Sequence, residues 1–319
     1  MQQASWELIK GNALTVLRTL PSDSIHCCVT SPPYYGLRNY GVEGQIGLEP
    51  TVQEFIASLV DVFSEVRRVL RPDGTCWINI GDSYAQKGKR ATKEELLTDK
   101  QRAVDKRYHT EAFTGYPGWD RAAGTAGNGL KVKDLIGVPW RLALALQDKG
   151  WWLRSDIIWQ KTNPLPSSVK DRPALCHEYM FFLTKRPRYY YDSFAVREPI
   201  AASTKGRLKR GVNGGNKYAN GAPGQPKQSM SRPRANDQAR PEPATRNKRT
   251  VWNVACTALH ENFFAAFPPK LIEPCILAGS SEYGVCIQCG APWKRIIAPT
   301  PEYAQYLGKG YHDHSSDKT

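Results

Sequence analysis

Two hydroxyl groups, a double proline and two aromatic rings lie within residues 30–35, which read TSPPYY. The stretch follows an apolar run from Ile25 to Val29 that predicts a β-strand. Pro32 and Pro33 donate no backbone N–H and each fix φ near about −65°, so the chain forms a rigid turn here. Open α/β sheets bind ligands at the carboxyl ends of their strands, which makes this turn a candidate reaction centre. An ordinary proline loop closing a strand is the alternative interpretation.

Strands and helices that would position this turn alternate along the chain. Apolar periodicity and turn residues predict helices over residues 13–20, 51–70, 134–149 and 270–278, the second of them capped by Thr51. They predict strands over residues 6–10, 25–29, 75–80, 151–159, 177–184 and 250–256. We expect Arg71 to Gly74 to form a turn, and Tyr189 to Tyr191 to pair with the preceding strand as a hairpin. This alternation up to about Asp192 predicts an α/β layer architecture.

Charge and length narrow the class of protein. With 319 residues, of which 40% are hydrophobic, the chain is long enough for a sizeable core. Its net charge of +14 favours a polyanionic partner such as nucleic acid. Residues 201–250 carry twelve Lys or Arg against two Asp or Glu and are loop-like in composition, so we call them the basic stretch. No long apolar run or signal peptide occurs, so we expect a cytoplasmic protein without a membrane partner.

Three separated motifs resemble the DNA amino-methyltransferases of the permuted beta class. They are SPPY at residues 31–34, SDIIWQKTNP at residues 155–164, and the helix entry at residues 264–278. In that family the SPPY or DPPY loop comes first, the target-recognition region lies in the middle, and the glycine-rich S-adenosylmethionine loop comes last. The resemblance covers roughly residues 6–285 apart from two insertions. It implies a Rossmann-like, S-adenosylmethionine-dependent methyltransferase fold, with helices on both faces of a mixed sheet.

The same resemblance implies catalytic roles for Ser31, Pro32, Pro33 and Tyr34. The Ser31 hydroxyl and the Pro32 carbonyl would accept hydrogen bonds from an exocyclic amine, and Tyr34 would stack on the flipped-out base. Serine in place of an acidic residue resembles the cytosine-N4 members, and an adenine-N6 enzyme is the alternative. Tyr35 would be a second stacking face or part of the core.

Further positions match family motifs around the base, the cofactor and the DNA. Trp159, Lys161 and Asn163 match the loop near the flipped base, although Trp159 would also suit a core and Lys161 a phosphate contact. The cofactor side is implied by six residues, of which the last four would equally form a hydrophobic staple at a helix start: Thr30, Ser31, Phe264, Phe267, Pro268 and Leu271. Phosphate contacts are expected from seven cations of the basic stretch: Lys205, Arg207, Lys209, Arg210, Arg246, Lys248 and Arg249. Asp82 follows a predicted strand, and we interpret it as a turn-capping aspartate, with a functional role as the alternative.

Two features depart from the family pattern. Its Asp-Pro-Phe-x-Gly-Ser-Gly cofactor loop does not occur between Gly279 and Thr319. We therefore expect an incomplete sheet that lacks strands one and two, which would lie between the strands at residues 6–10 and 25–29 and leave a gap in its middle. The chain would be a truncated form or be completed by another chain, and as given it would bind S-adenosylmethionine weakly or not at all. Cys286 and Cys289 look like half of a zinc ribbon. Zinc takes four ligands, so a full-length form would be the one to bind it.

These observations divide the chain into six parts. They are a first core part (1–84), a polar insertion (85–132), a second core part (133–192), a basic target-recognition region (193–250), a cofactor-side helix (251–285), and a zinc-knuckle half with a tail (286–319). The leading hypothesis is a site-specific DNA methyltransferase acting on cytosine N4 in duplex DNA, with a cognate restriction enzyme as a further candidate partner. The rivals are an adenine-N6 enzyme and a non-catalytic DNA-binding protein with a degenerate methyltransferase fold.

Overall fold

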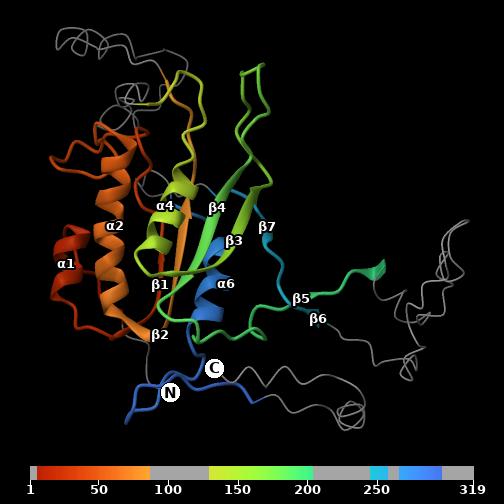
Figure 1. Cartoon of the computed structure of the whole chain (residues 1–319). Helices are drawn as coiled ribbons and strands as arrows, with labels where there is room; N and C mark the ends of the chain where they lie inside the picture. The colour runs from red at the N-terminus through yellow and green to blue at the C-terminus, as the bar shows by residue number, and fades with distance from the viewer. Residues whose placement is uncertain (1–5, 87–128, 204–244, 258–265, 297–319) are drawn as a thin grey trace, which may run out of the picture.

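The computed structural model describes residues 6–86, 129–203, 245–257 and 266–296. Its centre is a five-stranded sheet with the order β1-β2-β4-β3-β7 (Figure 1). The strands are β1 (Ile25–Thr30), β2 (Leu70–Ile80), β4 (His177–Thr184), β3 (Trp152–Lys161) and β7 (Val251–Val254). A separate two-stranded ladder joins β5 (Glu198–Pro199) to β6 (Thr245–Arg246), which the sequence did not predict.

Strand direction brings the ends of all five strands to a common edge. β1 runs parallel to β2, and β3 runs parallel to β7. β4 lies between these pairs and runs antiparallel to both of its neighbours. The carboxyl ends of four strands therefore meet the amino end of β4 at one edge, which we call the carboxyl edge of the sheet.

Helices cover both faces of this sheet (Figure 1). α2 (Val52–Val69) and α4 (Val138–Asp148) pack on one face, and the short α1 (Ala13–Thr19) contacts α2. α6 (Pro269–Gly279) packs on the other face. Successive residues of β2 point to opposite sides, so that Ile78 belongs to the α2 and α4 core while Trp77 belongs to the α6 core. The expected mixed sheet with helices on both faces is confirmed.

Capping residues explain where the two large helices begin. The Thr51 side chain accepts a hydrogen bond from the Glu54 N–H at 3.1 Å and starts α2, as predicted. α4 begins at Val138, four residues later than expected, because Gly137 has a φ of 75°. Gly137 has no side chain, and Asp82 Oδ1 instead accepts the N–H groups of Gly137 and Val138 at 3.0 and 3.1 Å. The capping role of Asp82 is confirmed.

The strand predicted at Trp6 to Lys10 is wrong. These residues have no regular secondary structure, and Trp6 and Leu8 are 86% and 83% exposed. β1 is the last strand of the sheet, and no other strand of the described chain pairs with its outer edge. A single strand without a partner leaves its backbone groups unsatisfied and is not stable. The expected gap in the middle of the sheet is therefore wrong for the described residues, because the five strands pair without interruption and the sheet ends at β1.

Two other local predictions are also corrected. Arg71 to Gly74 is no separate turn, because β2 continues through it with an irregularity in its pairing to β1. Gly74 permits this close pairing, since a Cβ there would lie 3.1 Å from the His26 carbonyl oxygen. Tyr189 to Tyr191 forms no hairpin with β4, since both edges of β4 are already occupied by β2 and β3. The Tyr190 N–H instead donates to the Asp73 carbonyl at 2.9 Å.

None of the helices within the described segments is long and apolar enough to span a bilayer. Most of the polar insertion and most of the basic stretch lie outside the described residues. The division of the chain into six parts therefore remains a prediction.

Candidate active site

The TSPPYY turn lies at the carboxyl edge, directly after β1. Pro32 is buried, while Ser31, Pro33 and Tyr34 are half-buried. The next loop folds back onto the turn, with the Gly36 N–H donating to the Gly47 carbonyl at 2.8 Å. A Cβ on Gly47 would approach the Tyr34 carbonyl oxygen to 3.0 Å. The turn is therefore braced by its own loop as well as stiffened by its prolines.

One carboxylate connects this turn to three strands. The Tyr34 hydroxyl donates to Glu178 Oε2 at 2.5 Å, and the Asn79 amide donates to the same oxygen at 3.2 Å. Lys161 Nζ lies 2.5 Å from Glu178 Oε1. Asn79 lies on β2, Lys161 ends β3 and Glu178 is the second residue of β4. We call these four residues the Glu178 cluster.

Tyr34 remains a neutral hydrogen-bond donor in this cluster. Burial is the main cause that raises the pKa of Tyr34 well above its usual value. The negative charge and the hydrogen bond of Glu178 raise this pKa further, while the Ser31 hydroxyl and the Gly81 N–H oppose the rise. A phenol that keeps its proton can go on donating to the carboxylate.

Glycine at position 81 makes room for the cluster. A Cβ there would lie 2.7 Å from Tyr34 Cε2 and 3.3 Å from Glu178 Cδ. Sequence reasoning missed Gly81, Asn79 and Glu178 as site residues. Two signals were available in the sequence. One is the glycine directly after the buried strand β2, and the other is the glutamate at the second position of the segment HEYMFFLT. Both signals are weak without knowledge of the strand order.

Of the three residues predicted near the base, only Lys161 joins the turn. Trp159 is a core residue, 4% exposed, whose indole N–H donates to the Val254 carbonyl at 2.9 Å. Asn163 braces the segment after β7, because it accepts from the Cys256 N–H at 2.7 Å and donates to the Cys256 carbonyl at 3.1 Å. Trp159 and Asn163 therefore hold β3 to β7, while Lys161 points to Glu178.

Some of the residues predicted to bind the cofactor lie in the α6 core, and others lie toward the carboxyl edge of the sheet. Leu271 has no exposed surface and packs in the α6 core, and Phe264 lies outside the described residues. Phe267 is half-buried against that core, and Pro268 precedes the first residue of α6. Because the end of α6 lies against Cys27 near the start of β1, its beginning lies toward the carboxyl edge. Phe267 and Pro268 therefore lie toward the same edge as the turn.

The described cations of the basic stretch make contacts within the chain. Arg246 and Arg249 pair with Glu198 at 2.9 and 2.7 Å. Lys248 Nζ lies 4.8 Å from the centroid of the Trp252 ring. Lys205, Arg207, Lys209 and Arg210 lie outside the described residues. The DNA contacts assigned to all seven cations stay a prediction. In this structure Arg246 and Arg249 hold the end of the basic stretch to Glu198 of β5, and Lys248 contacts a core tryptophan.

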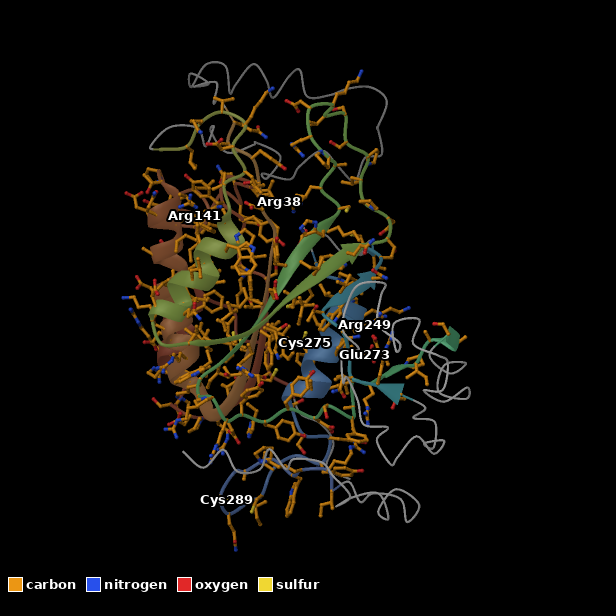
Figure 2. The ribbon with its side chains drawn as sticks, turned by 45° about the vertical axis from the view of Figure 1, so that its right-hand side comes forward. Arg38, Arg141, Arg249, Glu273, Cys275 and Cys289 are labelled. Carbon is orange, nitrogen blue, oxygen red and sulfur yellow. The ribbon has the colours of Figure 1, made fainter. Side chains whose placement is uncertain are left out.

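The two cysteines of the zinc-ribbon half lie away from the turn. Figure 2 shows Cys289 at the end of the molecule remote from Arg38, which follows the turn in sequence. The Gly290 N–H donates to the Cys286 carbonyl at 2.8 Å, and backbone N–H groups of Cys289 and Gln288 lower the pKa of Cys286. Within the described segments no three or more metal-binding side chains gather. The zinc site therefore stays a prediction.

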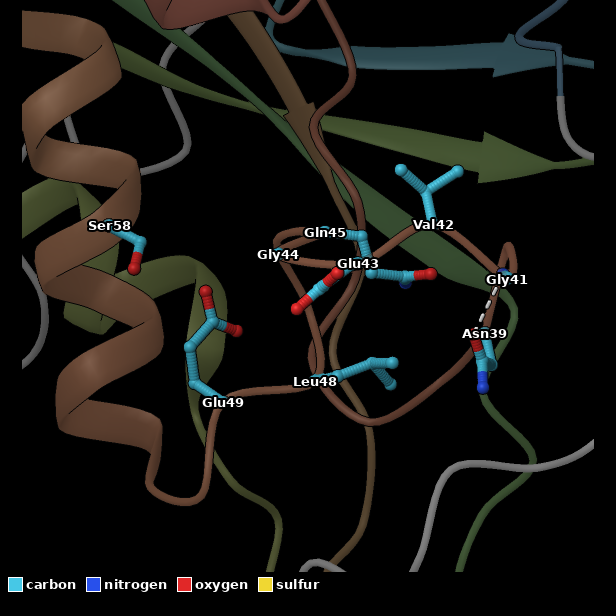
Figure 3. Close-up of a pocket in the computed structure, with 9 residues that line it drawn as sticks. All are labelled: Asn39, Gly41, Val42, Glu43, Gly44, Gln45, Leu48, Glu49 and Ser58. Carbon is cyan, nitrogen blue, oxygen red and sulfur yellow. Dashed lines mark hydrogen bonds between the residues drawn. The ribbon is translucent and has the colours of Figure 1, made fainter.

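A pocket in the loop after the turn is separate from the Glu178 cluster (Figure 3). It is formed by the loop that precedes α2 and by Ser58 of α2. Glu43 and Glu49 contribute carboxylates to its wall, and none of the four cluster residues lines it. An acidic wall repels phosphate, so this pocket is a poor candidate for DNA contact.

Comparisons with known proteins agree on one family. The family model described as DNA methylase matches residues 25–287. The chain is 44% identical over 273 residues to the Type II methyltransferase M.XycI of Xanthomonas campestris pv. cyanopsidis, covering 86% of this chain and 72% of that protein. It is 40% identical over 280 residues to the Type II methyltransferase M.SmaI of Serratia marcescens, covering 88% and 77%. Among solved structures, the PvuII DNA methyltransferase (cytosine-N4-specific) matches with a TM-score of 0.47 at 14% identity, over 85% of this chain and 69% of that chain.

Proposed function

We propose that this chain, which belongs to the DNA methylase family of N6 and N4 methyltransferases, acts on the N4 amine of a flipped-out cytosine in duplex DNA. The methyl donor of this family is S-adenosylmethionine. The observation that carries the proposal is the SPPY motif at the carboxyl edge, with Ser31 half-buried and Tyr34 half-buried within the Glu178 cluster.

Residues of the turn would prepare the amine for attack. An exocyclic amine is a poor nucleophile, because its lone pair is delocalised into the ring. The Ser31 hydroxyl and the Pro32 carbonyl would each accept a hydrogen bond from this amine and favour a pyramidal nitrogen. The prolines hold these two acceptors in a fixed orientation, so positioning supplies much of the acceleration. No strong base is needed, since the nitrogen sheds its proton after it has become cationic.

The described residues fit one side of the cofactor. Half-buried polar groups on Thr30 and Ser31, and the half-buried ring of Phe267, leave a polar and aromatic surface toward the carboxyl edge. These residues and Pro268 would hold the methionine half of S-adenosylmethionine, with the aromatic ring suited to its sulfonium charge. The cofactor supplies the methyl group when it is bound.

Cytosine N4 is favoured over adenine N6 by the residue at position 31. Serine in place of an acidic residue at this position resembles the cytosine-N4 members of the family. Part of the DNA affinity would come from the basic stretch, whose excess of twelve cations over two anions suits a phosphate backbone. The names of the relatives include Type II methyltransferases, so a cognate restriction enzyme is a proposed partner.

Mass spectrometry of digested genomic DNA tests the reaction. The full reading frame that contains this chain is expressed in a bacterial host whose own DNA lacks N4-methylcytosine, beside its Ser31→Ala variant. We expect N4-methylcytosine in the first culture and at least about tenfold less in the second. N6-methyladenine alone would overturn the base assignment.

A non-catalytic DNA-binding protein is the second candidate. The basic stretch favours it, because DNA binding alone would account for this excess of cations. Calorimetry on the protein from the full reading frame separates the candidates. A methyltransferase binds S-adenosylmethionine and gives a heat signal, while a pure DNA binder gives a flat titration yet still binds duplex DNA.

A further inference from the structure

Glu178 has a place at the candidate site that the SPPY chemistry does not use. Its side chain is 13% exposed and lies among residues from three other segments. Oε2 accepts from the Tyr34 hydroxyl at 2.5 Å and from the Asn79 amide at 3.2 Å, and Oε1 accepts from Lys161 Nζ at 2.5 Å. A buried carboxylate is costly to desolvate, and here both of its oxygens are satisfied by donors.

The strand order explains why Glu178 reaches these partners. Glu178 pairs with Trp159 of β3, and the next residue, Tyr179, pairs with Ile80 of β2. The side chain therefore lies between the carboxyl ends of β2 and β3, next to the turn after β1. Asn79 steadies the arrangement, because its amide also donates to the Tyr179 carbonyl at 3.1 Å.

An ion pair of the same kind at the opposite edge provides a comparison. Lys185 follows β4, and its Nζ lies 2.6 Å from Asp23 Oδ1 and 2.7 Å from the Leu70 carbonyl oxygen. Asp23 is 53% exposed, and Lys185 otherwise donates to main-chain carbonyl oxygens of Arg68 and Leu70. That pair secures the beginning of β2. The partners of Glu178 are side chains, two of which belong to the proposed base pocket.

We propose that Glu178 is a positioning residue that fixes the Tyr34 ring and the Lys161 ammonium group in a single arrangement around the target base. This inference rests on the proposed function. Tyr34 can present its ring to a base only if the ring is held, and the hydrogen bond to Glu178 holds its hydroxyl end. Lys161 is engaged by the same carboxylate, so it acts inside the pocket and is not a phosphate contact.

The test is a double-mutant cycle in the full chain with Tyr34→Phe and Glu178→Gln. Tyr34→Phe removes only the hydroxyl, and Glu178→Gln keeps an oxygen acceptor while it removes the charge. We expect single-turnover methylation to fall about tenfold in each variant and the double variant to be little slower than the slower single variant. DNA affinity should stay within about threefold, since no phosphate contact is lost. Asp23→Asn is the control and should keep the wild-type rate.

A base-flipping reporter separates positioning from a general loss of structure. With 2-aminopurine at the target position, a smaller fluorescence increase on binding is expected for Glu178→Gln and an unchanged increase for Asp23→Asn. Multiplicative losses in the double variant, or a Glu178→Gln enzyme as fast as the control, would overturn the proposal.

Failure of the proposed function has a different signature. In that case the wild-type protein itself leaves DNA unmethylated. The double-mutant cycle then uses the midpoints of urea unfolding of the wild type, the two single variants and the double variant. The double variant should then unfold no earlier than the less stable single variant. Additive shifts of the midpoint would refute the link between Tyr34 and Glu178.

Discussion

The two edges of the central sheet each carry a lysine paired with a carboxylate, and the pairs do different work. At the carboxyl edge, Glu178 is 13% exposed and receives donors from Tyr34, Lys161 and Asn79. At the opposite edge, which we call the amino edge, Asp23 is 53% exposed and its partner Lys185 donates to main-chain carbonyls as well. An exposed ion pair contributes little stability by itself, whereas breaking a buried one leaves an uncompensated charge.

This difference shows that a lysine–carboxylate pair stabilises the sheet at one edge and positions candidate active-site side chains at the other. Lys185 satisfies backbone carbonyls where a helix passes into β2, which any fold of this kind must do in some way. Glu178 binds side chains from separate segments at the carboxyl edge, where the proposed base pocket lies. Substitutions at the two edges should therefore separate stability from activity.

The largest expected effect comes from Gly81→Ala. Its Cβ would lie 2.7 Å from Tyr34 Cε2, a distance that requires the ring to move. We expect methylation to fall by about tenfold to a hundredfold while DNA binding remains. Stopped-flow or quench kinetics on a duplex substrate measure the rate.

Gly279→Ala is the matched control for this overpacking. Its Cβ would lie 2.8 Å from Cys27 Sγ at the far end of α6, so it disturbs the core without touching the turn. The variant should lose stability and keep its rate per folded molecule. Equal losses of rate in both variants would remove the distinction between the two edges.

Exchange of the two lysines for methionine gives an effect of intermediate size. Lys185→Met leaves the Leu70 carbonyl without its 2.7 Å donor and should lower the free energy of unfolding by about 1–3 kcal/mol.

Lys161→Met should reduce methylation about tenfold, because Glu178 loses its cation beside Tyr34. Urea unfolding and single-turnover assays on both variants provide the measurements. A Lys185→Met protein that is stable but inactive would reverse the assignment.

The smallest effect is a pH dependence at the amino edge. The hydrogen bond from Lys185 is the main cause that lowers the pKa of Asp23 below 3.8, and partial burial opposes it. Because the folded pKa is lower than the unfolded pKa, the stability that Asp23 provides is present above about pH 4 and is lost as the pH falls through the folded pKa.

Thermal unfolding of wild type and Asp23→Asn between pH 2.5 and 7 measures this dependence. The two curves should differ at neutral pH and converge in acid. A difference that persists at pH 2.5 would mean that the ionised Asp23 is not what contributes.

Local sequence signals predicted much of the frame. Periodicity and Thr51 located α2, the apolar run located β1, and the double proline located the turn. Each of these depends on neighbours in sequence. The part played by Glu178 depends on which strands lie beside β4, and alternation of apolar residues does not reveal that order. The hairpin expected at Tyr189 failed for the same reason, since β4 had no edge left to offer.

The fate of individual site residues has a similar explanation. Trp159 was open to two interpretations, and burial between β3 and β7 makes it core. Lys161, two residues further along the same strand, reaches the carboxyl edge and joins Glu178. A spacing of two residues keeps both side chains on one face of the sheet. Lys161 is outside the core because it is the last residue of β3, whereas Trp159 lies further inside the strand.

Ser31→Ala tests the central claim most directly. The claim is that the TSPPYY turn is the base side of a methyltransferase site, with the Ser31 hydroxyl accepting a hydrogen bond from the target amine. Single-turnover methylation and duplex affinity are measured side by side at saturating S-adenosylmethionine. We predict a rate at least about tenfold lower and an affinity within about threefold of wild type. A wild-type rate in Ser31→Ala would contradict the claim.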